Sequence, residues 1–138
     1  MKALVLLAML AATGAKPWLG VGLLLQDDTS GGKFLFVAAV PEGTPAAAAG
    51  LRAQDLITAI DGKKITFRDD LDLLEFLGAL EPDRTLRLRV VRSGKTMDAR
   101  LKVGRMPAEY EARWNATLAR ARAKREAAAK AGPRPPRS

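Results

Sequence analysis

Apolar runs of strand length mark the first part of the chain. Residues 18–26 (WLGVGLLLQ) and 34–40 (FLFVAAV) are almost wholly apolar, which is the pattern of strands buried on both faces. The polar stretch DDTSGGK predicts a turn between them, at residues 27–33. We therefore expect two consecutive strands joined by this turn.

The last third of the chain predicts a strand pair followed by a helix. Residues 86–90 (LRLRV) alternate apolar and basic side chains with a period of two, as a half-exposed strand does. Ser93-Gly94 predicts a hairpin turn, and residues 96–103 return as the partner strand. From residue 107 to about residue 130 the chain is rich in Ala, Arg and Glu, which favours a helix.

A dense series of turn and helix signals lies between these regions, at residues 40–65 (VPEGTPAAAAGLRAQDLITAIDGKKI). The opening Pro and Gly predict a turn, because Pro fixes φ and Gly accepts a positive φ. Thr44 is expected to cap a short helix over residues 46–49, and Gly50 suits the left-handed residue that ends it. A strand over residues 55–60 then runs into a tight turn at Asp61-Gly62.

Residues 66–80 predict an amphipathic helix with acids near its start, where they complement the helix dipole. Its apolar side chains fall on two stripes of the helix surface. The first stripe consists of Leu73, Leu77 and Leu80 with Phe76 beside them, and the second of Phe67, Leu71, Leu74 and Gly78. We assign the first stripe to the core, because it continues to the helix end, and the second to a groove.

These elements predict the α+β class, as a small, partly closed β-barrel or sandwich of five to six strands. One short helix, one longer helix and a C-terminal basic helix complete it. The order of turn, Ala-rich helix, Gly stop and strand ending in Asp61-Gly62 resembles the central segment of PDZ domains, particularly those of bacterial envelope (HtrA-like) proteases. The stretch WLGV at residues 18–21 resembles their carboxylate-binding loop. The resemblance covers about residues 18–103.

This resemblance implies a module that binds peptides by adding them as a strand to an exposed sheet edge. A Gly lets the backbone turn so that successive N–H groups converge on an anion. We assign the peptide carboxylate to the amides of Leu19, Gly20 and Val21. The peptide strand and its pocket are assigned to Val21, Gly22, Leu23, Leu24, Leu25, Leu71 and Leu74. Such a pocket favours C-termini with an apolar last residue, although residues 19–25 could instead form a plain core strand.

Composition excludes several kinds of chemistry. The chain has no Cys and no His, so it has no disulfide, no Cys nucleophile, no Ser–His–Asp triad and no zinc site of thiolates or imidazoles. Asp69, Asp70 and Asp72 are interpreted as helix-start charges, not as catalytic or metal-binding carboxylates. We therefore predict no catalytic residue, no metal and no cofactor, and a protein that is not an enzyme.

Charge is concentrated towards the C-terminus and raises an alternative function. The net charge is +8, and from Arg105 onward nine basic and three acidic residues account for +6 of it. This segment could bind anionic lipid or lipopolysaccharide, with nucleic acid the less natural target of an exported protein. Tyr110, Trp114 and Leu118 are spaced by four and form a thin apolar stripe, which either docks on the barrel or meets a partner.

The N-terminus predicts export. Met1-Lys2 followed by an apolar run over residues 3–12 has the pattern of a signal peptide, with cleavage expected after Ala15. The expected domains are a signal peptide (1–15), a PDZ domain (16–104), a basic Ala/Arg-rich helix (105–130) and a disordered Pro/Arg tail (131–138). The protein would then be secreted or periplasmic, as an adaptor in envelope protein quality control with a protease as a partner. The ligand and the oligomeric state stay open.

Overall fold

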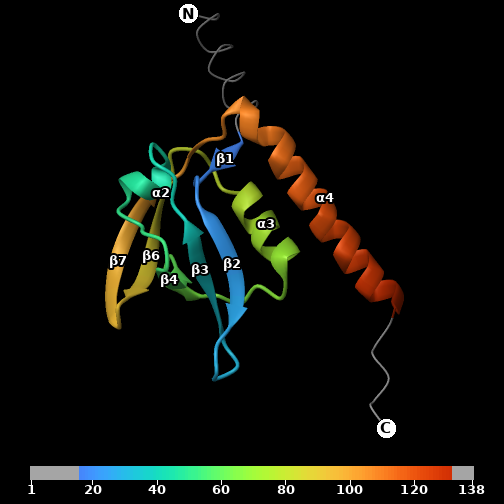
Figure 1. Cartoon of the computed structure of the whole chain (residues 1–138), viewed down its shortest axis with the longest axis horizontal. Coiled ribbons are helices and arrows are strands. Elements are labelled where there is room, and N and C mark those ends of the chain that lie inside the picture. Colours follow the sequence, from blue (N-terminus) through green and yellow to red (C-terminus); the bar gives the residue numbers. More distant parts are fainter. Residues whose placement is uncertain (1–15, 132–138) are drawn as a thin grey trace, which may run out of the picture.

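Residues 16–131 are described in a computed structural model of the protein, and the expected signal peptide (1–15) and residues 132–138 of the expected tail lie outside them. Figure 1 shows a twisted sheet with α3 beside it and a long α4 packed on α3. In chain order the elements are β1 (Pro17–Trp18), β2 (Gly22–Asp27), β3 (Lys33–Ala39), α2 (Pro45–Ala48), β4 (Leu56–Ile60), β5 (Lys63–Lys64), α3 (Asp70–Gly78), β6 (Thr85–Arg92), β7 (Lys95–Lys102), β8 (Gly104–Arg105) and α4 (Ala108–Ala131).

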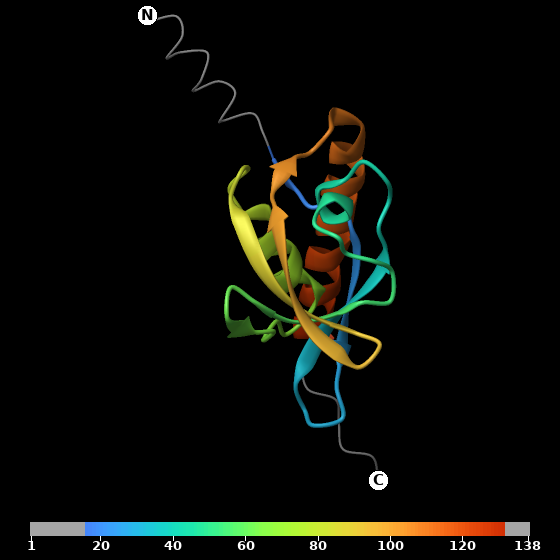
Figure 2. The same cartoon turned by 90° about the vertical axis from the view of Figure 1, so that its left-hand side faces the viewer.

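The main sheet has six antiparallel strands and confirms the α+β prediction. Its order is β2-β3-β4-β6-β7, with β5 paired to β4, and it does not close into a barrel. The short strands β1 and β8 form a separate pair, in which Trp18 lies opposite Gly104. Figure 2 shows this pair at the end of the sheet from which α4 starts. The prediction of one continuous strand over residues 18–26 is therefore wrong. Residues 19–21 form a loop that separates β1 from β2.

The predicted turns and the short helix are confirmed by backbone angles and hydrogen bonds. Positive φ values occur at both Asp61 and Gly62, 52° and 81°, as a two-residue hairpin turn requires. The hydroxyl of Thr44 accepts a hydrogen bond from the Ala47 N–H at 3.2 Å and thereby caps α2. Gly50 follows α2 with a φ of 86°, the left-handed geometry that ends a helix.

The core lies between the sheet and α3 and contains one buried ion pair. Its fully buried side chains include Leu35, Val37, Ile57, Leu86, Val90, Leu101 and Val103. Asp55, at 1% exposure, accepts hydrogen bonds from Arg92 at 2.7 and 2.8 Å. These bonds hold the pKa of Asp55 below its ordinary value. The pair ties the start of β4 to the end of β6, and each charge is compensated by the other.

The helix predicted over residues 66–80 is shorter at both ends, spanning Asp70–Gly78. It begins late because Asp69 is its N-cap: the residue is extended, and its carboxylate accepts the Asp72 N–H at 3.1 Å. The acids near its start therefore act as a cap and as first-turn charges. Within residues 16–131, no helix combines the length and the apolar composition needed to cross a bilayer.

Candidate functional site

An open sheet edge lies beside α3. Strand β2 pairs with β3 along one side and ends the order of the main sheet, so its other side has no strand partner within residues 16–131. A cavity of about 490 Å³ opens between the start of β2 and α3. This volume lies within the range of about 300–1,000 Å³ that is typical of ligand pockets.

Four segments line this cavity. The segment from β1 to the start of β2 contributes Pro17, Trp18, Leu19, Gly20, Val21, Gly22 and Leu23. Helix α3 contributes Leu73, Leu74 and Leu77, and α4 with the residue before it contributes Met106, Tyr110, Arg113, Trp114 and Thr117. Ala39, Pro41 and Thr44 complete the lining. The lining is predominantly apolar, and Arg113 is the one charged residue in it.

Residues 19–21 form a loop that is held by its own backbone. The Leu19 carbonyl accepts a hydrogen bond from the Ala46 N–H at 3.0 Å, which fixes the loop against α2. Gly20 has a φ of +67°, and a Cβ there would lie 2.5 Å from the Cβ of Thr44. Glycine is thus required at this position by conformation and by space. The N–H groups of Leu19, Gly20 and Val21 donate no hydrogen bond to another part of the described chain.

Side chains of β2 alternate between two faces, as the pleat of a strand dictates. Leu23 and Leu25 pack against the core, but only Leu23 also lines the cavity. Leu24 points to the opposite face and is 49% exposed. Leu24 can therefore contribute only its backbone to a groove, and Leu25 lies beyond the cavity. The ladder register shifts between Gly22 and Leu23, where β2 bends towards the loop.

The assignment of the two α3 stripes is corrected by the structure. Leu71 is buried at 7% exposure and is not among the residues that line the cavity, whereas Leu74 is. Leu73 and Leu80 are buried in the core as assigned, but Leu73 and Leu77 also line the cavity. The cavity lies over the middle and end of α3, so the first-turn residue Leu71 does not reach it. Apolar groove residues thus come from both stripes.

Helix α4 is a wall of the cavity that the sequence did not predict. The ring of Tyr110 stacks on Trp18 with centroids 5.5 Å apart. Trp114 lies against α3 at Gly78, where an added Cβ would be 3.3 Å from the indole. The spacing of Tyr110, Trp114 and Leu118 left docking and partner binding open, and the structure shows docking. The Lys16 ammonium also donates to Asn115 Oδ1 at 3.0 Å.

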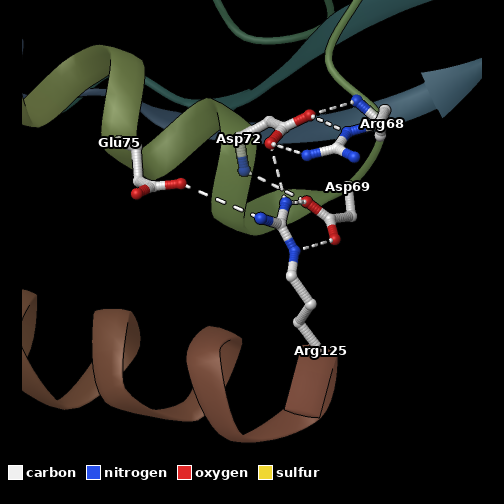
Figure 3. A network of polar contacts seen from close by, with 5 residues as sticks. All are labelled: Arg68, Asp69, Asp72, Glu75 and Arg125. Carbon is white, nitrogen blue, oxygen red and sulfur yellow. Dashed lines mark hydrogen bonds and ion pairs between the residues drawn. The ribbon is translucent and has the colours of Figure 1, made fainter. Parts of the chain in front are cut away.

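An ionic cluster, here called the Arg125 clamp, joins the later part of α4 to the start of α3 (Figure 3). The Arg125 guanidinium donates to both carboxylate oxygens of Asp69 and, at 2.7 Å, to Asp72. Glu75 lies 3.9 Å away, and Arg68 donates to Asp72 from the other side at 3.0 Å. Hydrogen bonds from Arg125 lower the pKa of Asp69, and those from Arg68 and Arg125 lower the pKa of Asp72.

The acidic residues at the start of α3 are therefore engaged in helix capping and in the Arg125 clamp. Across residues 16–131, no group of three or more His, Cys, Asp or Glu side chains has the arrangement of a metal site. The arrangement that remains for function is the cavity with its open strand edge and its unpaired loop amides.

Comparison with known proteins identifies the family of this arrangement. The family model described as "PDZ domain" matches residues 17–103, which include the loop, β2 and α3. The chain belongs to the PDZ domain family. The resemblance inferred from WLGV and the segment at residues 40–65 is therefore confirmed.

Curated relatives of this PDZ chain are bacterial proteases. It is 32% identical over 118 residues to the probable periplasmic serine endoprotease DegP-like of Hahella chejuensis, covering 78% of this chain and 24% of the relative. It is 42% identical over 73 residues to the protein of the same description from Pseudomonas fulva, covering 53% of this chain and 15% of the relative. The chain thus spans less than a quarter of the length of these relatives.

Solved structures share the fold. An HtrA-type protease AlgW with decapeptide superposes with a TM-score of 0.57 at 23% identity, covering 76% of this chain and 34% of that one. The same protease with tripeptide gives a TM-score of 0.55 at 23% identity, covering 76% of this chain and 38% of that one. At this identity the similarity concerns the fold of the PDZ domain.

Proposed function

We propose that this PDZ chain is a non-catalytic module that binds C-terminal or extended segments of other proteins. The observation that carries the proposal is the combination of an apolar cavity with a β2 edge and three loop amides that have no partner within residues 16–131. Strand addition needs these three features in one place. The geometry also disfavours the alternative of a plain core strand, because a core strand would be paired on both sides.

Each feature has a role in the proposed complex. The peptide backbone pairs with the open edge of β2 over residues 22–25, whose main-chain groups point alternately to β3 and to the open edge. The terminal carboxylate accepts hydrogen bonds from the N–H groups of Leu19, Gly20 and Val21. The last side chain enters the cavity against Leu23, Leu74 and Leu77, which favours an apolar residue such as Val, Leu, Ile or Phe.

The comparisons support this proposal at the level of the family. Two of the solved structures that share the fold are of the HtrA-type protease AlgW, one with a decapeptide and one with a tripeptide. The relatives described as periplasmic support an exported or periplasmic location, together with the signal-peptide pattern of residues 1–15. An adaptor role beside an envelope protease would follow if the protein acts without a catalytic domain of its own.

A fluorescence-anisotropy titration tests the proposal. We expect a labelled octapeptide ending in Val-Leu to bind, and its C-terminally amidated form to bind at least tenfold more weakly, which corresponds to about 1.4 kcal/mol for the lost charge-assisted bonds. Binding that ignores amidation and falls steeply with salt would instead support the basic-helix alternative.

A pair of variants locates the site. Leu74→Lys places a charge in the cavity wall and should abolish binding, whereas Leu24→Lys, on the opposite face of the groove strand, should leave the affinity unchanged. Circular dichroism checks that both variants are folded. The Gly20→Glu variant is less informative, because any side chain there meets Thr44 and displaces the loop. Equal affinities of both leucine variants would contradict the proposed site.

A further inference from the structure

The cavity has a wall that lies outside the matched PDZ segment. The match ends at residue 103, but Tyr110, Arg113, Trp114 and Thr117 of α4 line the cavity together with β2 and α3. Figure 1 shows α4 running along α3, on the side of α3 that faces away from most of β2. The two contacts described above anchor α4 on α3: Trp114 at Gly78 and the Arg125 clamp at Asp69. Any peptide in the cavity therefore contacts α4.

We infer that α4 is a third wall of the peptide site and that Arg113 binds the terminal carboxylate of the peptide. This inference rests on the proposed function, because it assigns a further residue to the same groove. It predicts that affinity and preference for a free C-terminus depend on a side chain that the PDZ fold itself does not supply.

The position of Arg113 supports this role. Its guanidinium carbon lies 5.9 Å from the centroid of the Tyr110 ring, and that ring stacks on Trp18, the residue immediately before the loop. This series of contacts links the cation, through the Tyr110 ring, to the residue that precedes the loop. Within residues 16–131 the Arg113 side chain has no carboxylate partner, whereas Arg125 on the same helix has three carboxylates around it.

A cation in the cavity can compensate the negative charge of a bound carboxylate. The loop amides are neutral dipoles, and a carboxylate bound to them keeps its full negative charge. Among the residues that the structure describes, no acidic one lines the cavity and Arg113 is the only charged one, with the sign that a carboxylate needs. Arg113 is exposed, so water screens part of this attraction, but a guanidinium can bind both carboxylate oxygens at once. The cavity is therefore electrostatically complementary to a C-terminus.

The side chains of α4 line the cavity but do not fill it. An obstructing helix would place a large side chain beside the loop at residues 19–21. Trp114, the largest side chain of α4, instead packs towards Gly78 at the end of α3. A volume of about 490 Å³ remains beside the loop. On the β2 side this volume reaches Gly22 and Leu23 but not Leu25, so the enclosed part of the site fits the end of a peptide.

The test compares two charge-removing variants of α4 with the labelled Val-Leu octapeptide, in free and amidated forms. Arg113→Gln should weaken binding of the free form about tenfold, the effect of losing one charge-assisted contact, and leave the amidated form unchanged. Arg122→Gln is the matched control, because Arg122 is an exposed residue of α4 that does not line the cavity. Arg113→Lys should recover part of the affinity, since it restores the charge without the planar fork.

The outcomes separate this inference from the function on which it rests. If the wild type prefers the free peptide and Arg113→Gln retains the same preference, the Arg113 assignment is wrong and the proposed function stands. A gain of affinity in Arg113→Gln would show α4 to be an obstructing cover. If the wild type binds both peptides equally, the assignment of Arg113 and of the loop to the carboxylate fails, and if it binds neither peptide, the proposed function fails as well.

Discussion

The two ends of α4 are attached to the PDZ domain by different kinds of contact. Near its start, Tyr110 stacks on Trp18 and Trp114 packs against Gly78, so aromatic surface is removed from water. Fifteen residues after Tyr110, Arg125 joins the helix to Asp69 and Asp72 by ion pairs. One end is therefore held by packing and the other by charge.

This difference indicates which end matters for the cavity. Hydrophobic packing is nearly independent of salt and tolerates acid, whereas exposed ion pairs are screened by salt and lost when the carboxylates are protonated. The packed end is the one that lines the cavity and carries Arg113. The ionic end sets the direction of α4 along α3. The following predictions test this division.

The largest effect is expected from Trp114→Ala. The substitution removes a half-buried aromatic side chain that contacts α3 and the cavity, which should cost about 2 kcal/mol of α4 docking, less than for a fully buried ring. Native-state hydrogen exchange should show faster exchange along the whole of α4, with the main sheet little affected. Unchanged α4 protection would mean that the aromatic end does not hold the helix.

A smaller and more local effect is expected from Arg125→Ala. The change removes the cation that bridges Asp69 and Asp72, so like charges at the start of α3 lose their compensation. Hydrogen exchange should accelerate in the last turns of α4 and leave the turns around Tyr110 and Trp114 protected. Lys124→Ala is the control, because Lys124 is the exposed neighbour of Arg125 and should have little effect. Uniform acceleration along α4 would contradict the division into two ends.

Acid should remove the same clamp without a mutation. The pKa values of Asp69 and Asp72 are lowered in the folded protein from the ordinary value of 3.8. A lowered carboxylate pKa contributes stability above the unfolded value and loses it as the pH falls through the folded value. The difference in α4 exchange between wild type and Arg125→Ala should therefore be full near neutral pH and shrink below about pH 4. A difference that persists at low pH would show that Arg125 acts by packing.

Salt should have the smallest effect. Raising the ionic strength to about 1 M shortens the screening length to about 3 Å, which weakens the partly exposed Arg125 clamp but not the aromatic contacts. We expect a modest acceleration of exchange at the C-terminal end of α4 only. The Arg125→Ala variant should show no such salt response, and a response of equal size in that variant would assign it to another part of the helix.

The PDZ fold and the loop were accessible from the sequence, because local rules determine them. A Thr before Pro caps a short helix, Gly at a positive φ ends it, and Asp-Gly turns a hairpin, whatever the rest of the protein does. Gly20 was predicted in the same way, because a glycine lets the backbone of the loop turn. Leu71 was misplaced, because helical spacing gives the residues that share a face but not the neighbouring elements that cover each part of that face.

What the sequence by itself determined is the set of local elements, the family and the apolar character of the groove, since each depends on neighbouring residues or on a short pattern. The tertiary structure alone decided that α4 returns to the groove and that Arg113 and Arg125, two similar residues of one helix, have different surroundings. Arg125 meets Asp69, which is far away in the chain, whereas Arg113 lies beside Tyr110, whose ring stacks on the distant Trp18. Long-range contacts of this kind are set by the packing of complete elements, and no local pattern of an Arg-rich helix encodes them.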